Sequence, residues 1–116
     1  MPKIYLSPST QEFNLYANRG DEEYWMNKIA DAMEPYLLSS GIEFVRNDPE
    51  QTVVNSIAQS NLAHYGMHVA LHSNASPEDM SGLLRGSDVY YRPGDSQNAL
   101  LSRRFAKIAA EELQKI

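Results

Sequence analysis

Cysteine is absent from the 116-residue sequence, which removes several kinds of chemistry at once. A disulfide scaffold, a zinc site built from thiolates and a thiol nucleophile are all excluded. A metal ion could be held only by histidine, aspartate or glutamate, or by amide and hydroxyl oxygens.

Basic residues are few, and long apolar runs are missing. Ten Lys and Arg side chains stand against fifteen Asp and Glu, and the net charge of −5 argues against nucleic acid or an anionic membrane as a partner. No segment is apolar enough for a membrane span, and the first residues lack the apolar core of a signal peptide. We therefore expect a soluble, cytoplasmic protein without an export signal.

Apolar periodicity predicts strands that alternate with helices in one domain of 116 residues. The spacing of Met26, Ile29 and Met33 is typical of a helix, which we expect to begin at Asp21 and to end before Gly41. The expected strands are 3–6, 42–45, 67–71 and 89–91, and a loop is expected at 76–86. The expected helices are 21–40, a shorter one that starts at the turn Asn47–Pro49 and is ended by Tyr65–Gly66, and 98–116. This order predicts an α/β fold with a largely parallel sheet covered by helices.

Such a fold brings three polar segments towards one edge of the sheet, where parallel strands end and functional groups collect. The segments are Ser7–Gln11 after the first strand, Glu22–Glu23 at the start of the first helix, and His72–Asn74 after the third strand.

His72, at a strand end, is a better candidate for a metal ligand than His68. The two share a strand face but lie about 13 Å apart at roughly 3.3 Å per residue, so one zinc ion cannot bind both. We expect His68 to be buried or to orient a neighbour. Residues 72–74 could equally form a simple turn, and acidic residues in a first helical turn also suit the helix dipole. The residue pattern alone therefore predicts an α/β domain but no specific function.

Several segments resemble the zinc-dependent N-acetylmuramoyl-L-alanine amidases of the cell-wall-hydrolase type, particularly their clostridial and phage branch. The most specific segment is Val69–Ala75, which contains the histidine-small-asparagine-alanine sequence. The other segments are Ile4–Gln11, Glu22–Asp31, Ser40–Asn47 and Gly86–Tyr91. Together they follow the order of the family along the whole chain.

The resemblance implies a zinc ion held by two histidines and one glutamate, with a polarised water that attacks the amide between N-acetylmuramic acid and L-alanine. By position, Glu23 matches the glutamate ligand through its spacing to Asn27, and His72 matches the second histidine. The first histidine is replaced, and Gln11 is the nearby residue that would serve as a weak third ligand or as a substrate contact.

The family's catalytic glutamate stands on a strand that follows the last helix, beyond Ile116, so no catalytic residue is assigned. The expected fold is a shortened three-layer α/β sandwich of the amidase type, with helices on both faces of a mostly parallel sheet of about four strands, formed by residues 1–116. A missing strand would leave an open sheet edge, from which we expect a homo-oligomer.

Two functions follow from these expectations. The first is a peptidoglycan amidase domain, either complete or incomplete in catalysis, in which Ser73 and Asn74 shape the pocket. If phage-encoded, it would be released by lysis. The second is a non-catalytic protein on the same scaffold that sequesters a small ligand or a partner protein. Contacts to an anionic ligand would come from Arg46, Arg85 and Arg92, although surface arginines are more often simply solvated.

Overall fold

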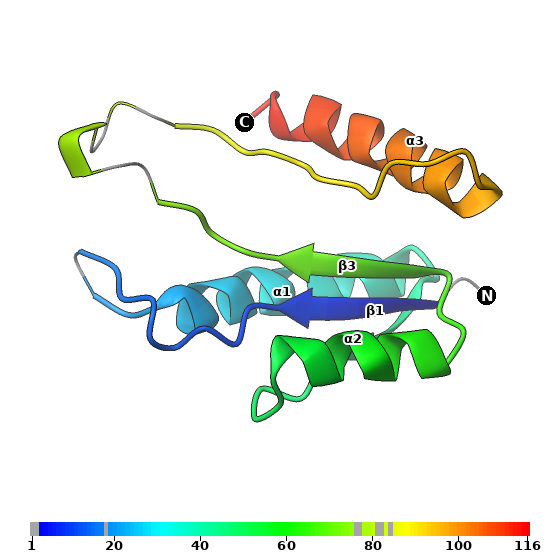
Figure 1. Cartoon of the computed structure of the whole chain (residues 1–116), viewed down its shortest axis with the longest axis horizontal. Helices are drawn as coiled ribbons and strands as arrows, with labels where there is room; N and C mark the ends of the chain where they lie inside the picture. Colours follow the sequence, from blue (N-terminus) through cyan, green and yellow to red (C-terminus); the bar gives the residue numbers. More distant parts are fainter. Residues whose placement is uncertain (1–2, 18, 76–77, 81–82, 84) are drawn as a thin grey trace. The chain divides into compact units, whose positions relative to one another are not determined.

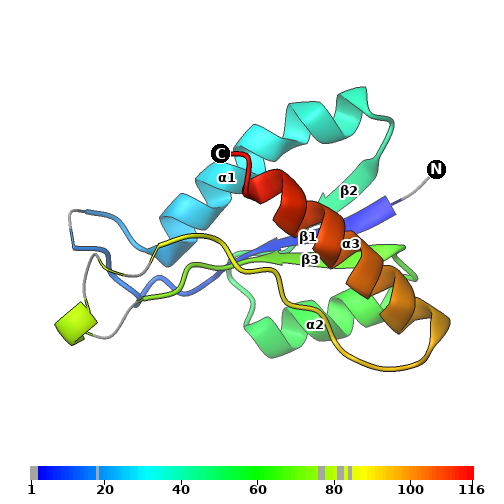
Figure 2. The same ribbon diagram turned by 90° about the horizontal axis from the view of Figure 1, so that it is seen from above.

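The computed structural model describes residues 3–17, 19–75, 78–80, 83 and 85–116 of the chain. These residues form two compact units, Met1–Asn74 and Ala75–Ile116. The first unit contains β1 (Lys3–Pro8), α1 (Glu22–Ser39), β2 (Glu43–Arg46), α2 (Val53–Leu62) and β3 (Met67–Leu71), as Figure 1 and, for β2, Figure 2 show. The second contains a short 3-10 helix (Glu78–Met80) and α3 (Gln97–Leu113).

The first unit is built on a parallel three-stranded sheet in the order β2-β1-β3. The central strand, β1, pairs with β2 through Leu6 opposite Arg46 and with β3 through Tyr5 opposite His68. Because β1 is flanked on both sides, Tyr5 and Leu6 are completely buried and form the centre of the core.

The helices α1 and α2 lie on opposite faces of this sheet (Figure 2). Arg46 shares a face with Leu6, and its guanidinium forms an ion pair with Glu34 of α1. Tyr5 points to the other face because neighbouring strand residues alternate, and its hydroxyl donates a 2.7 Å hydrogen bond to Gln59 of α2. Each face of the sheet therefore has a helix beside it within residues 1–74, while His68 and Ala70 of β3 stay exposed.

The ends of α1 follow from local sequence. The Asp21 side chain accepts a 2.8 Å hydrogen bond from the backbone N–H of Tyr24, which satisfies one of the free donors at the helix start. At the other end Gly41 has a φ of +71°, and the N–H of Ile42 donates to the carbonyl of Leu37. A left-handed residue of this kind ends a helix at low cost when it is glycine.

The α/β class, the parallel sheet and the six elements other than the fourth strand agree with the sequence-based prediction. The expected strand at 89–91 is wrong, because Val89–Tyr91 forms no strand among the described residues. A strand exists only when a neighbour satisfies its backbone groups, whereas apolar and aromatic composition indicates only that a segment would suit a sheet.

The segment expected to be a loop also contains a short helix. The expected loop at 76–86 contains the 3-10 helix at Glu78–Met80, and its positions 76, 77, 81, 82 and 84 lie outside the described residues. Among the described helices, none combines the length and the apolar character that crossing a membrane requires.

Candidate functional site

A buried carboxylate and a half-exposed imidazole meet at the carboxyl edge of the sheet. Glu22, the first residue of α1, is only 1% exposed, whereas the side chain of His72, just beyond β3, is 44% exposed. Glu22 Oε1 lies 3.0 Å from His72 Nδ1. Residues 50 positions apart are therefore brought into contact by the parallel arrangement of the strands.

Several donors surround the Glu22 carboxylate. Its Oε1 also accepts a 3.2 Å hydrogen bond from the backbone N–H of Ser73, and its Oε2 accepts one from the Asn14 side-chain amide. Burial by itself raises the pKa of Glu22, but hydrogen bonding outweighs burial and leaves the pKa below its ordinary value. Glu22 is therefore held as a carboxylate in a buried position.

The carboxylate determines how His72 can act. A carboxylate only accepts hydrogen bonds, so the proton of a neutral His72 imidazole belongs on Nδ1, which faces Glu22. The lone pair of the ring is then on Nε2. An imidazole oriented in this way can accept a proton or bind a metal ion through Nε2.

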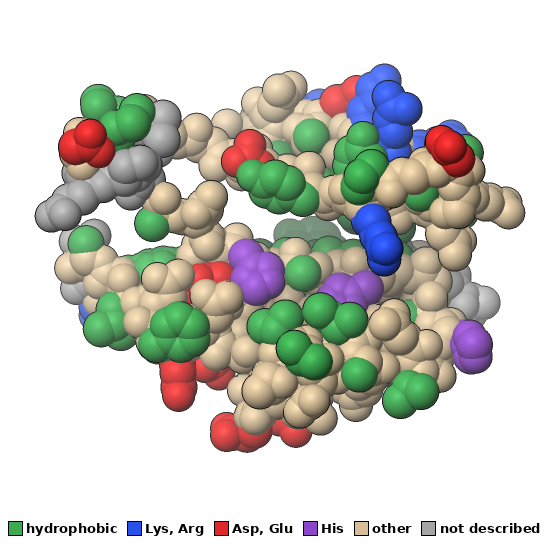
Figure 3. All heavy atoms as spheres, viewed as in Figure 1, with side chains coloured by type: hydrophobic (Ala, Val, Ile, Leu, Met, Phe, Trp, Pro, Cys, Tyr) green, Lys and Arg blue, Asp and Glu red, His purple; other side chains and the backbone are tan. Residues whose placement is uncertain are grey.

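A pocket of about 140 Å³ adjoins this pair on the α2 side of the sheet. His72 lines the pocket together with His68 of β3, and Ser7 and Thr10 contribute from β1 and the loop after it. The start of α2 supplies Ser56. Figure 3 shows histidine side chains exposed on this face of the protein, one of them directly beside acidic side-chain atoms.

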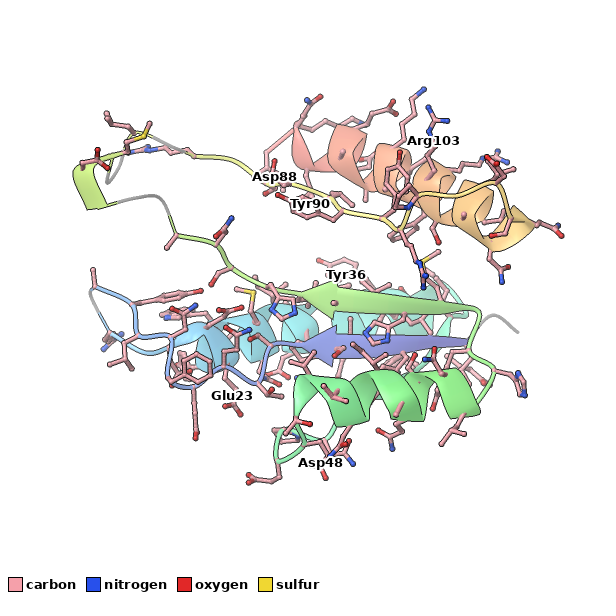
Figure 4. The ribbon with its side chains drawn as sticks, in the orientation of Figure 1. Glu23, Tyr36, Asp48, Asp88, Tyr90 and Arg103 are labelled. Carbon is pink, nitrogen blue, oxygen red and sulfur yellow. The ribbon has the colours of Figure 1, made fainter. Side chains whose placement is uncertain are left out.

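Glu23, the expected metal ligand, is placed differently from Glu22. In Figure 4 it points away from the end of β3, and its backbone carbonyl accepts a hydrogen bond from the Asn27 side chain. Burial, followed by the charges of Glu12, Asp21 and Glu50, raises its pKa. The spacing to Asn27 thus reflects a contact with the backbone of Glu23, and it is Glu22 that contacts His72.

The other residues expected at the site are positioned as follows. The N–H of Gln11 donates to the Ser9 side chain, and Gln11 is partly exposed in the loop after β1. Ser73 reaches the site through its backbone N–H, and Asn74 is exposed next to it. The three polar segments are therefore brought to one edge, as predicted, with Asn14 as a further participant.

Three arginines are expected to contact an anionic ligand, and Arg46 is the one that lies in the same unit as the Glu22–His72 pair. Arg46 does not face the Glu22–His72 pair, because its guanidinium binds Asp31 and Glu34 of α1. Arg85 and Arg92 are exposed in the second unit.

The arrangement does not amount to a complete zinc site. Within the part of the chain that the structure describes, no three His, Asp or Glu side chains converge so that they could hold a metal ion. Both oxygens of Glu22 already accept hydrogen bonds. Zinc usually binds four donors, of which three come from the protein even in open catalytic sites.

Asn14 is the site residue that the sequence did not indicate. It lies in a polar loop, and a lone asparagine in a loop is most often part of a turn. The backbone hydrogen bond from Glu22 N to Asn14 O explains its position, since it fixes the loop against the first turn of α1.

Comparison with known proteins adds no family assignment. No family model matches the sequence, and no curated protein is significantly similar to it.

Proposed function

We propose that this chain is an amidase-type domain, a shortened three-layer α/β sandwich that acts on the amide between N-acetylmuramic acid and L-alanine in peptidoglycan. The observation that carries the proposal is the contact between buried Glu22 and His72 beside a pocket. The resemblance of Val69–Ala75 to the amidase family supports the choice of substrate. That segment contains His72, the residue around which the site is built.

Amide hydrolysis requires two proton transfers that His72 is placed to perform. A water loses a proton as its oxygen attacks the carbonyl carbon, and the leaving nitrogen gains a proton as the C–N bond breaks. His72 Nε2 accepts the first proton and returns it to the nitrogen. The carboxylate of Glu22 holds the ring in place and stabilises the imidazolium between the two steps.

Zinc, with His72, Glu23 and Gln11 as its ligands, remains a proposal that rests on the resemblance. If zinc is bound, it would acidify a water and polarise the carbonyl. The contact between Glu22 and His72 would then fix the orientation of a metal-binding imidazole, a role that carboxylates often have around zinc-bound histidines.

The test measures the release of peptides with a free L-alanine amino group from purified peptidoglycan, in the presence and absence of added zinc, together with the zinc content of the protein. We expect His72→Ala to lower the rate about 10²- to 10⁴-fold. Glu22→Gln should lower it too. Glu23→Gln removes the neighbouring carboxylate and separates two cases: activity is kept if Glu22 alone supports His72, and it is lost if Glu23 binds zinc. Thermal unfolding of each variant shows whether it is folded.

The activities of the three variants show which glutamate supports His72. Loss of activity in His72→Ala and Glu22→Gln, with activity kept in Glu23→Gln, supports the proposal and the role of Glu22. Loss of zinc and activity in Glu23→Gln would instead support the ligand set implied by the resemblance. No peptide release by the folded protein, with or without zinc, would refute the amidase proposal.

A second candidate is a non-catalytic binding protein that uses the same pocket. It is favoured by the lack of three converging metal-binding side chains among the described residues. Binding needs only a preformed pocket with a few polar groups. Saturable binding of muropeptides without their cleavage would support this candidate over the first.

We also propose that the protein forms a homo-oligomer through a sheet edge. Within the described sheet, β2 and β3 each pair with β1 on one side only. Backbone groups on the other side of an edge strand can pair with a strand of another copy.

A further inference from the structure

The size of the pocket beside His72 limits what it can hold. Its volume is about 140 Å³. A cavity of roughly 150 Å³ accepts a molecule the size of benzene. A complete sugar ring with its hydroxyl groups is too large for this space, but a substituent of the ring would fit while the ring stays at the pocket mouth.

The charge of the pocket argues for an uncharged ligand group. No Lys, Arg, Asp or Glu is among the described residues that line it. Residues 1–74 contain four Lys and Arg against nine Asp and Glu, a net charge of −5 that disfavours an anion. Partial burial lowers the pKa of His68, although this residue is exposed overall and not buried as expected from the sequence.

The polar groups of the pocket suit a ligand that both donates and accepts hydrogen bonds. Hydroxyl groups of Ser7 and Thr10 can act in either direction. Burial raises the pKa of Tyr5, and the neighbouring Ser56 hydroxyl, which is itself buried, partly offsets this rise by hydrogen bonding to the phenol.

Apolar side chains complete the pocket. Strand β1 supplies Pro8, strand β3 supplies Ala70, and helix α2 supplies Val53 and Ile57. A methyl group placed against them would be removed from water, which contributes favourably to binding. The ligand group should thus combine a methyl group with a donor and an acceptor, and it should be smaller than benzene.

We propose that this pocket binds the acetamido group of an N-acetylated amino sugar. The group has a methyl, an N–H donor and a carbonyl acceptor, it carries no charge, and it fits the available volume. This inference rests on the proposed function for the choice of a sugar ligand, and it names the part of the peptidoglycan that the pocket recognises.

The test uses N-acetylglucosamine as the probe, followed through the ring signals of His68 and His72 by NMR. Glucosamine, which lacks the acetyl group, and glucose, which lacks the whole substituent, are titrated in parallel. We expect a saturable shift of the imidazole signals with N-acetylglucosamine and at least about tenfold weaker binding of the other two sugars. Peptide release from peptidoglycan is measured on the same samples.

Two variants with the same substitution locate the site. Ala70→Leu places a larger side chain in the pocket and should weaken binding of N-acetylglucosamine at least about tenfold. Ala58→Leu, at an exposed position of α2 outside the pocket, should leave the affinity unchanged. Since the three sugars are also compared on the unmodified protein, the test does not depend on the folding of Ala70→Leu.

The outcomes separate this inference from the proposed function. Binding of N-acetylglucosamine without peptide release supports the pocket assignment and refutes the amidase proposal. Peptide release without a saturable imidazole shift overturns the pocket assignment and leaves the amidase proposal standing. Equal binding of glucose, or equal affinity in Ala70→Leu and Ala58→Leu, also overturns the assignment.

Discussion

At the scale of single residues, two adjacent glutamates have opposite environments. Glu22 is buried among hydrogen-bond donors, which leave its pKa below the ordinary value in spite of burial. Glu23 is partly exposed, and burial together with neighbouring carboxylates raises its pKa. Charge on Glu22 therefore stabilises the fold, whereas charge on Glu23 opposes it.

We expect Glu22→Gln to destabilise the protein by about 2 kcal/mol at pH 7, because a buried carboxylate that accepts several hydrogen bonds is lost. A lowered folded-state pKa contributes stability that is complete above the unfolded value of about 4.5 and is lost as the pH falls through the folded pKa. The difference between the variant and the unmodified protein should therefore shrink below about pH 4.5. Urea unfolding at a series of pH values measures it, and a difference independent of pH would contradict the assignment.

Glu23→Gln should behave in the opposite way. A raised folded-state pKa contributes stability that is present below about pH 4.5 and is lost as the pH rises through the folded pKa. Removing the charge should therefore make the variant more stable than the unmodified protein near pH 7, with little difference in acid. Urea unfolding at the same pH values provides the comparison, and a variant less stable at neutral pH would show that Glu23 has a favourable partner.

The sequence does not determine which of the two adjacent glutamates faces His72. The order of the elements predicted that the ends of β1 and β3 and the start of α1 would meet, and Glu22 and His72 do meet there. Which of two adjacent glutamates faces His72 depends on the rotation of α1 about its axis. With 3.6 residues per turn, one position changes the direction of a side chain by about 100°, and spacing to Asn27 does not determine that rotation.

At the scale of elements, one arginine connects strand β2 with helix α1. The Arg46 guanidinium binds Asp31 and Glu34 through Nη1, and through Nη2 it donates a hydrogen bond to the side-chain oxygen Oδ1 of Asn27. The sequence predicted both elements from periodicity and from their end residues. It did not predict this contact, because pairing of side chains across elements depends on the packing of α1 on the sheet. The prediction of a strand at 89–91 is wrong for a related reason, because the composition of this segment does not specify a neighbouring strand to pair with.

We expect Arg46→Ala to lower the free energy of unfolding by about 1 kcal/mol, because the partners of Arg46 are partly exposed and water screens the ion pairs. High salt should reduce the difference. Chemical unfolding at low and high salt measures the effect. Arg19→Ala is the control, as its guanidinium forms no ion pair with the described residues, and an equal loss in both variants would contradict the role of Arg46.

At the scale of the whole molecule, the negative charge is concentrated in one unit. Residues 1–74 carry the entire net charge of −5, whereas residues 75–116 contain six basic and six acidic side chains. Copies that associate through the sheet of the first unit would bring like charges together, and salt screens this repulsion.

Analytical ultracentrifugation should therefore show a homo-oligomer whose association strengthens between about 0.05 M and about 0.5 M NaCl. Screening of the repulsion between the acidic units is the physical reason. A protein that stays monomeric at every salt and protein concentration would refute association through the sheet edge, and association that weakens with salt would indicate attraction between opposite charges instead.

The 50-residue separation between Glu22 and His72 has a consequence for the order of folding. β3 can align beside β1 only after the intervening chain, which contains α1, β2 and α2, has closed a long loop. Contacts between distant positions form slowly because they require this loss of chain entropy before they stabilise anything. The imidazole of His72 therefore acquires its carboxylate partner late in folding, and its NMR signal reports on completion of the native sheet.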